Sequence, residues 1–141
     1  MLLGFDFGAR RIGVAVGQTV TGSATAVGTV AASQGVPDWN AVDTCIAQWS
    51  PGRLLVGLPY NMDGSETTTT AACRAFGEKL ARRTGLPVVY VDERLTSAAA
   101  YDELRSERRS GTRARRIRPR DVDANAARLI LETWMRAHRG T

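Results

Sequence analysis

Three short apolar runs, separated by tight breaks, open the chain. Residues 2–8, 12–17 and 24–31 are rich in Val, Ile, Leu, Phe, Thr and Ala, and turns at 8–11 and 19–22 divide them. Runs of this length and composition that are joined by short turns predict antiparallel strands. The first third of the chain is therefore expected to form a meander.

Strands and helices alternate in the rest of the chain. The expected elements are a helix at 37–49, a strand at 54–58, a helix at 67–83, a strand at 88–91, a helix at 96–107 and a last helix from 119. Strands that alternate with helices favour parallel pairing. We therefore predict an α/β protein with the ribonuclease H-like fold, in which one domain at residues 1–141 has a central mixed five-stranded sheet and helices on both faces.

Three acidic residues lie where these elements begin or end. Asp6 is in the first apolar run, Glu93 follows the run at 88–91, and Asp123 opens the apolar pattern of the last helix. An ionised carboxylate in such a place is costly unless it is paired or binds a metal. Ligands of parallel sheets gather at the carboxyl ends of the strands. We expect the three carboxylates to converge there on a divalent cation.

The last helix carries a second acid close to Asp123. At ~100° per residue, Asp123 lies on the apolar stripe of Ala127 and Ile130, whereas Asp121 points ~200° away from it. Asp121 is therefore interpreted as an ordinary acid near a helix N-terminus, where the helix dipole favours negative charge. The same interpretation stays open for Asp123.

The positive charge is concentrated in the last third of the chain. The net charge is +5, and residues 1–92 carry 7 basic and 7 acidic side chains, whereas residues 93–141 carry 12 and 7. Segment 108–120 is rich in Arg and has no acid, which suits phosphate binding through guanidinium groups. We expect Arg113, Arg115, Arg116 and Arg118 to bind nucleic acid; a solvated loop is the alternative.

No apolar run approaches the ~20 residues that a membrane-spanning helix needs. The chain begins with a strand-like run in place of a charged segment before a long apolar one, so a secretory leader is not expected. Cys45 and Cys73 follow no metal-binding or redox spacing and are expected to be buried free thiols. A soluble, cytoplasmic protein is expected.

Four segments resemble a known family. They read FDFG at 5–8, VGLPYNMDG at 56–64, DERLT at 92–96 and VD at 122–123. In these segments and their order the chain resembles the YqgF family, also called RuvX, whose members are described as Holliday junction resolvases and as pre-16S rRNA nucleases. The resemblance implies a bacterial cytoplasmic nuclease linked to the 5′ end of 16S rRNA. Asp6, Glu93 and Asp123 match the family's acids, but Arg120 and Asp121 stand where members often have Gly and Lys.

Phosphodiester hydrolysis fits these residues. Two Mg²⁺ or Mn²⁺ ions ~3.5–4 Å apart, held by carboxylates, can activate water and stabilise the leaving oxygen. Asp6, Glu93 and Asp123 are the expected catalytic and metal-binding residues, and Asp92 is a secondary candidate. Phosphate contacts are expected from Arg10, Arg11, Asn61 and Arg94, although turn formation and solvation also explain these side chains.

Other functions stay open at this stage. A Holliday junction resolvase, or a ribosome assembly factor that binds nucleic acid without cutting it, would have the same sequence features. Asp6, Phe7, Gly8 and Gly13 also resemble the phosphate hairpin of actin-like ATPases, but those proteins need two such domains. The sequence leaves open the substrate (precursor rRNA or branched DNA), endonuclease or exonuclease action, and a monomer or a homodimer.

Overall fold

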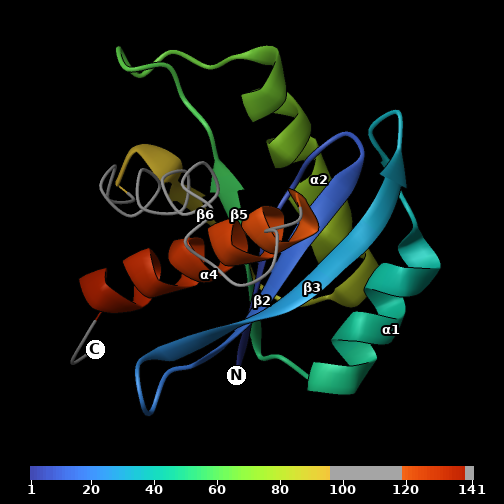
Figure 1. Ribbon diagram of the computed structural model, residues 1–141, viewed down its shortest axis with the longest axis vertical. Helices are drawn as coiled ribbons and strands as arrows, with labels where there is room; N and C mark the ends of the chain where they lie inside the picture. Colours follow the sequence, from blue (N-terminus) through green and yellow to red (C-terminus); the bar gives the residue numbers. More distant parts are fainter. Residues whose placement is uncertain (96–118, 139–141) are drawn as a thin grey trace, which may run out of the picture.

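The structure is a computed structural model that describes residues 1–95 and 119–138 (Figure 1). The elements, in chain order, are β1 (Leu2–Asp6), β2 (Arg11–Gln18), β3 (Ser23–Ser33), β4 (Val36–Pro37), α1 (Trp39–Trp49), β5 (Arg53–Leu58), α2 (Thr68–Thr84), β6 (Val88–Asp92), the 3-10 helix η1 (Glu93–Leu95) and α4 (Pro119–Ala137). The expected helix at 96–107 and the Arg-rich segment at 108–118 lie outside the described residues.

The strands form one mixed sheet in the order β4-β3-β2-β1-β5-β6. β1, β2 and β3 pair antiparallel, whereas β1, β5 and β6 pair parallel. The α/β fold class is confirmed, but the sheet has six strands and not five. The additional strand β4 has two residues that pair with Ala32 and Ser33, and a two-residue strand containing proline leaves no hydrophobic pattern to detect.

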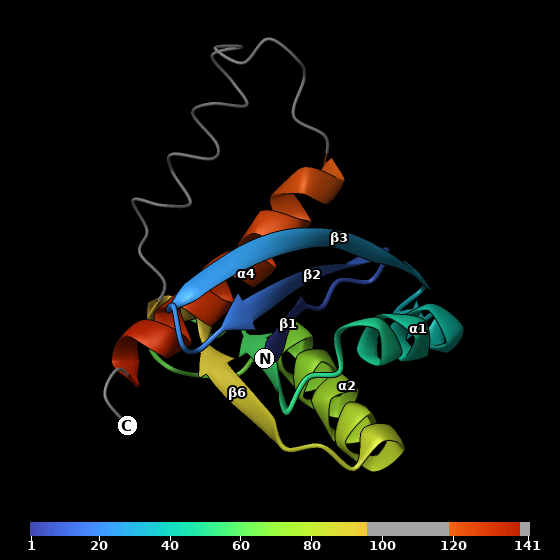
Figure 2. The same ribbon diagram turned by 90° about the horizontal axis from the view of Figure 1, so that it is seen from below.

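Helices cover both faces of the sheet. Figure 2 shows α4 on one side and α1 and α2 on the other. Along β1 the side chains alternate between two cores: Leu3 and Phe5 belong to the core under α1 and α2, and Leu2 belongs to the core under α4. Leu131 of α4 packs over Gly4, where an added Cβ would lie 2.7 Å from Leu131 Cγ. The apolar periodicity thus fixes which face of each element is buried.

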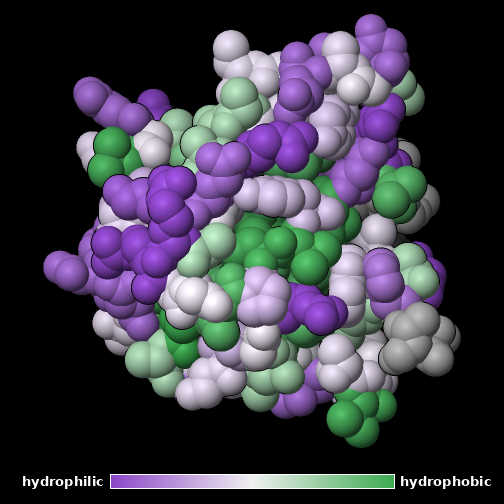
Figure 3. All heavy atoms as spheres, turned by 180° about the vertical axis from the view of Figure 1, so that it is seen from behind, coloured by the Kyte–Doolittle hydropathy of each residue, from purple (hydrophilic) through white to green (hydrophobic). Residues whose placement is uncertain are grey.

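The face with α1 and α2 is incompletely covered. Hydrophobic side chains gather at its centre among hydrophilic ones (Figure 3). Several side chains that pack against this core are only half-buried, among them Trp39, Leu86, Val88 and Tyr90. Cys73 is buried in this core and Cys45 is half-buried beside it, and both are free thiols.

Polar caps define the helix beginnings. Asp38 caps α1 through a bond from the Ala41 amide. Thr67 caps α2, because its hydroxyl oxygen accepts from the Thr70 amide. The Thr67 amide in turn donates to the Thr70 hydroxyl oxygen, which completes a reciprocal capping box. Ser65, which is also a good capping residue, does not cap this helix, because its amide and hydroxyl donate to Asp63 within the preceding turn.

Within residues 1–95 and 119–138, no helix is both long enough and apolar enough to cross a membrane.

Candidate active site

Asp6 and Glu93 meet at the carboxyl edge of the parallel strands. Asp6 is the last residue of β1, Glu93 directly follows β6, and β5 runs between these two strands. Gly57 of β5 makes room for the contact, because an added Cβ there would lie 2.6 Å from Glu93 Oε1 and 2.5 Å from Ile130 Cδ1. The missing side chain at Gly57 therefore lets Glu93 approach Asp6, and the two carboxyl groups share a hydrogen bond.

The environment disfavours ionisation of this pair. Burial raises the pKa of Asp6 well above its usual value, and the neighbouring charges of Glu93 and Asp123 raise it further. Burial also raises the pKa of Glu93, the hydrogen bond from Asp6 partly offsets the rise, and the charge of Asp92 adds to it. Two partly buried carboxyl groups in contact keep a proton more readily than an isolated, exposed one. A bound cation would remove the need for that proton.

Asp123 reaches the same edge from α4, which covers the face of the sheet toward which Asp6 points. Gly13 of β2 pairs with Asp6 in the antiparallel register. An added Cβ at Gly13 would lie 1.9 Å from the carbonyl oxygen of Asp123, so the first turn of α4 rests directly on the backbone of β2. The register of β1 and β2, together with a glycine at the crossing point, therefore places Asp6 near Asp123.

The carboxylate of Asp123 is engaged by Arg11. Arg11 Nε lies 2.9 Å from Asp123 Oδ2, and the side chains are 42% and 29% exposed. In this conformation, no three His, Cys, Asp or Glu side chains of the described residues form a group that could hold a metal ion. The structure thus joins Asp6 and Glu93 and places Asp123 close enough to act on Asp6 electrostatically, with Arg11 as the counter-ion of Asp123.

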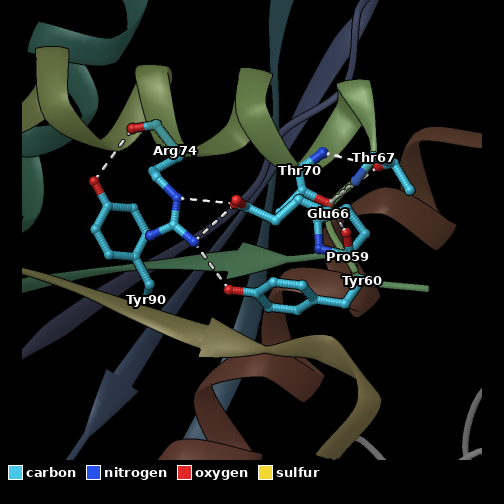
Figure 4. A network of polar contacts seen from close by, with 7 residues as sticks. All are labelled: Pro59, Tyr60, Glu66, Thr67, Thr70, Arg74 and Tyr90. Carbon is cyan, nitrogen blue, oxygen red and sulfur yellow. Dashed lines mark hydrogen bonds and ion pairs between the residues drawn. The ribbon is translucent and has the colours of Figure 1, made fainter. Parts of the chain in front are cut away.

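The loop after β5 is held in place by a polar network (Figure 4). Arg74 of α2 donates to Glu66 at 3.0 Å and to the hydroxyl of Tyr60 at 2.9 Å. The Tyr90 hydroxyl donates to the carbonyl oxygen of Arg74 at 3.2 Å, and Thr70 donates to the carbonyl oxygen of Pro59. The loop is thereby fixed at both ends beside the carboxylate pair.

Asn61, a predicted phosphate contact, lies in this loop. Its side-chain amide donates to Ser65 Oγ at 2.9 Å, and its backbone carbonyl accepts from the Gly64 amide. Gly64 adopts a φ of 89°, in the left-handed region that favours glycine. In this structure Asn61 therefore stabilises the turn, and its contact with phosphate stays a prediction.

The predicted arginines differ in their surroundings. Arg94 pairs with Asp92 at 2.7 Å, which lowers the pKa of Asp92, and its guanidinium lies 5.2 Å from the centre of the Tyr60 ring. Arg10 is exposed in the turn after β1. Arg113, Arg115, Arg116 and Arg118 lie outside the described residues, as does the side chain of Asp121.

Sequence reasoning missed three contributors to the site. It did not foresee that Arg11 pairs with Asp123, that Arg74 anchors the loop, or that Gly57 makes room for Glu93. For Gly57 a signal was present, because glycine inside an apolar strand often marks a close approach of another group. The two arginines gave no such signal, since their partners are 8 and 112 residues away in sequence.

Comparison with known proteins agrees with this arrangement. The model of the RuvX family, described as Holliday junction resolvase, matches residues 1–137. The chain belongs to the RuvX family. Two relatives of this RuvX chain, both named "Putative pre-16S rRNA nuclease", come from Coxiella burnetii (strain RSA 493 / Nine Mile phase I) and Pseudomonas aeruginosa (strain UCBPP-PA14). The Coxiella relative is 50% identical over 137 residues, which is 97% of this chain. The Pseudomonas relative is 49% identical over 139 residues, which is 98% of this chain. Each match covers 93% of the relative.

Solved structures confirm the fold of this RuvX protein. The Thermus thermophilus RuvC structure, titled as a complex with Holliday junction substrate, matches with a TM-score of 0.58 at 17% identity, over 98% of this chain and 96% of that one. The fowlpox virus resolvase in a complex with Holliday junction DNA matches with a TM-score of 0.50 at 8% identity, over 97% of this chain and 99% of the resolvase chain. At these identities the likeness establishes the ribonuclease H-like fold that the sequence predicted.

Proposed function

We propose that this RuvX protein is a metal-dependent nuclease that hydrolyses phosphodiester bonds in processing the 5′ end of precursor 16S rRNA. The observation that carries the proposal is the partly buried Asp6–Glu93 pair at the carboxyl edge of the sheet, beside Asp123. The names of relatives about half identical over nearly the whole chain support the substrate.

The donor set fits a hard divalent cation. Mg²⁺ and Mn²⁺ prefer carboxylate oxygens, and burial together with neighbouring carboxylates raises the pKa values of Asp6 and Glu93, which a bound cation would offset. Asp6, Glu93 and Asp123 would hold the metal, with Asp123 released from Arg11. Once bound, the metal would supply an activated water and stabilise charge on the leaving oxygen.

The remaining residues of the edge would position the substrate. Arg10 is exposed in the turn after β1, and Arg11, once released from Asp123, would be free to contact a phosphate. Arg94 follows Glu93 in η1, where Asp92 and the Tyr60 ring hold its guanidinium group. Positive side chains that follow both β1 and β6 suit a phosphate backbone that runs across the edge.

The decisive experiment compares two labelled substrates in parallel. Purified protein with Mg²⁺ or Mn²⁺ is expected to cleave a 16S precursor fragment faster than a four-way DNA junction, and Asp6→Asn is expected to abolish cleavage and remain folded. Asp121→Asn serves as the matched control and should retain most activity. Faster cleavage of the junction would favour the resolvase function, which the description of the family supports. Binding without metal-dependent cleavage would identify an assembly factor.

Three further expectations from the sequence stay predictions. They are a single domain at 1–141, a cytoplasmic location, and a monomer or homodimer.

A further inference from the structure

A cavity of about 550 Å³ lies beside the carboxylate edge, between α2 and the turn after β1. Its size is within the range of small-molecule sites, ~300–1,000 Å³. The lining includes Phe7 and Gly8 from the turn, Trp39 from the start of α1, and Ala75, Phe76 and Lys79 from α2. Nothing in the proposed hydrolysis uses this cavity.

Aromatic rings form much of its wall. The ring centres of Phe7 and Phe76 are 5.0 Å apart, and those of Trp39 and Phe76 are 5.7 Å apart at an angle of 28° between the ring planes. Lys79 Nζ lies 5.0 Å from the centre of the Trp39 ring, and Lys79 is the one charged side chain among the described lining residues. Flat rings with a nearby cation and no acid suit a nucleobase and its attached phosphate.

The cavity is linked to the proposed catalytic edge through the residues that directly follow Asp6. Asp6 is followed in the chain by Phe7, Gly8 and Ala9, which all line the cavity. Because consecutive Cα atoms are ~3.8 Å apart, Gly8 Cα lies within ~7.6 Å of Asp6 Cα. Asp6 points toward the α4 side and Phe7 toward the α1 and α2 side, so a strand crossing the edge would meet both.

We propose that this cavity receives one unstacked base of the substrate strand, next to the phosphate that is cleaved. The proposal rests on the proposed action on nucleic acid and adds to it a subsite that selects an unpaired nucleotide. A base already free of a partner enters at lower cost than one in a duplex, since no pairing or stacking is lost. The protein would thereby favour cleavage beside single-stranded or distorted positions.

Filling the cavity tests the proposal without disturbing the core. Ala75 is exposed on α2 and lines the cavity, so Ala75→Leu adds bulk there and keeps a good helix former. Ala71→Leu, at an exposed position on the same helix outside the lining, is the matched control. The probe is a fluorescein-labelled single-stranded RNA of about ten nucleotides, and binding is measured by anisotropy in EDTA to prevent cleavage. Ala75→Leu is expected to weaken binding about five-fold or more, with Ala71→Leu close to wild type.

A scan of abasic positions then identifies the base. In a series of RNAs that each lack one base, the wild-type protein is expected to lose most affinity at one position, and Ala75→Leu should lose that preference. Equal losses at every position, or an identical profile in wild type and Ala75→Leu, would overturn the proposal. If the wild type cuts neither substrate but shows one sensitive position, the proposed function fails and the base site stands. If the wild type cleaves RNA but loses the same affinity at every abasic position, the proposed function stands and the base site fails.

Discussion

Replacing Gly13 with Ala tests how closely α4 must lie on the sheet. The added Cβ would lie 1.9 Å from the carbonyl oxygen and 2.4 Å from the carbonyl carbon of Asp123, where ordinary contact begins at 3.4 Å. Both are backbone atoms that cannot rotate away, so the first turn of α4 must move outward by roughly 1.5 Å. Extra methyl groups in tightly packed places cost about 1–3 kcal/mol, and each kcal/mol lowers Tm by roughly 4 °C in a chain of this size.

Displacement of α4 should affect the site more than the fold. A shift of ~1 Å in a catalytic group can reduce the rate about 100-fold. We therefore expect Gly13→Ala to lose Mn²⁺ affinity and cleavage and to remain folded, as measured by calorimetry, by RNA cleavage and by urea unfolding.

Gly17→Ala is the control, because it lies on the same strand under the same helix. Its added Cβ would be 3.4 Å from Met135 Cε, the end of a flexible side chain. If Gly13→Ala and Gly17→Ala have equal stability and equal activity, the crossing of α4 over Gly13 does not position Asp123, and our account of the site is wrong.

Three further predictions concern charges around the site. Because the pKa of Asp6 is raised on folding, its protonation favours the folded state, so the free energy of unfolding in EDTA should fall as pH rises from about 4, the pKa of Asp in the unfolded chain. Urea unfolding between pH 4 and 8 should show a shallower fall in Asp6→Asn, and an unchanged slope would contradict this assignment. Arg11→Gln should bind Mn²⁺ about five-fold more tightly in calorimetry at low salt, with Arg10→Gln unchanged, and equal effects of the two variants would show that only net charge matters. Arg74→Met should leave global stability nearly unchanged but should speed amide exchange at residues 60–66, unlike Arg82→Met on the same helix.

The sequence predicted most of the sheet and the helices because their patterns are local. The alternation along β1 and β2 and the helical stripe of α4 each follow from residues close together in the chain. The cap of α2 shows where local patterns become ambiguous. Ser65 and Thr67 are both good capping residues. Thr67 is used because the hydroxyl of Thr70, three residues later, can accept a hydrogen bond from the Thr67 amide. The two-residue strand β4 is too short for any such pattern.

The candidate site was predicted less completely, because its contacts join distant segments. The end of β1 and the residue after β6 could be placed at one edge by topology alone, and the structure brings Asp6 and Glu93 into contact there. The pairing of Arg11 with Asp123 could not be inferred, since it depends on how far α4 reaches across β2. The cavity beside Phe7 also depends on tertiary packing, because its walls come from α1, α2 and two turns.

The charges at this edge suggest how one chain tolerates three neighbouring acids without a metal. Asp6 and Glu93 share a hydrogen bond, and Asp123 is neutralised by Arg11 from outside the pair. Removing one member of this partly buried group changes the charge that the others meet, so these arrangements depend on one another. Arg11 and Asp123 remain partly exposed, and such an ion pair contributes only about 0–1 kcal/mol. A cation that offers Asp123 a stronger partner therefore has little to overcome, and Arg11 is then free to contact a phosphate at the same edge.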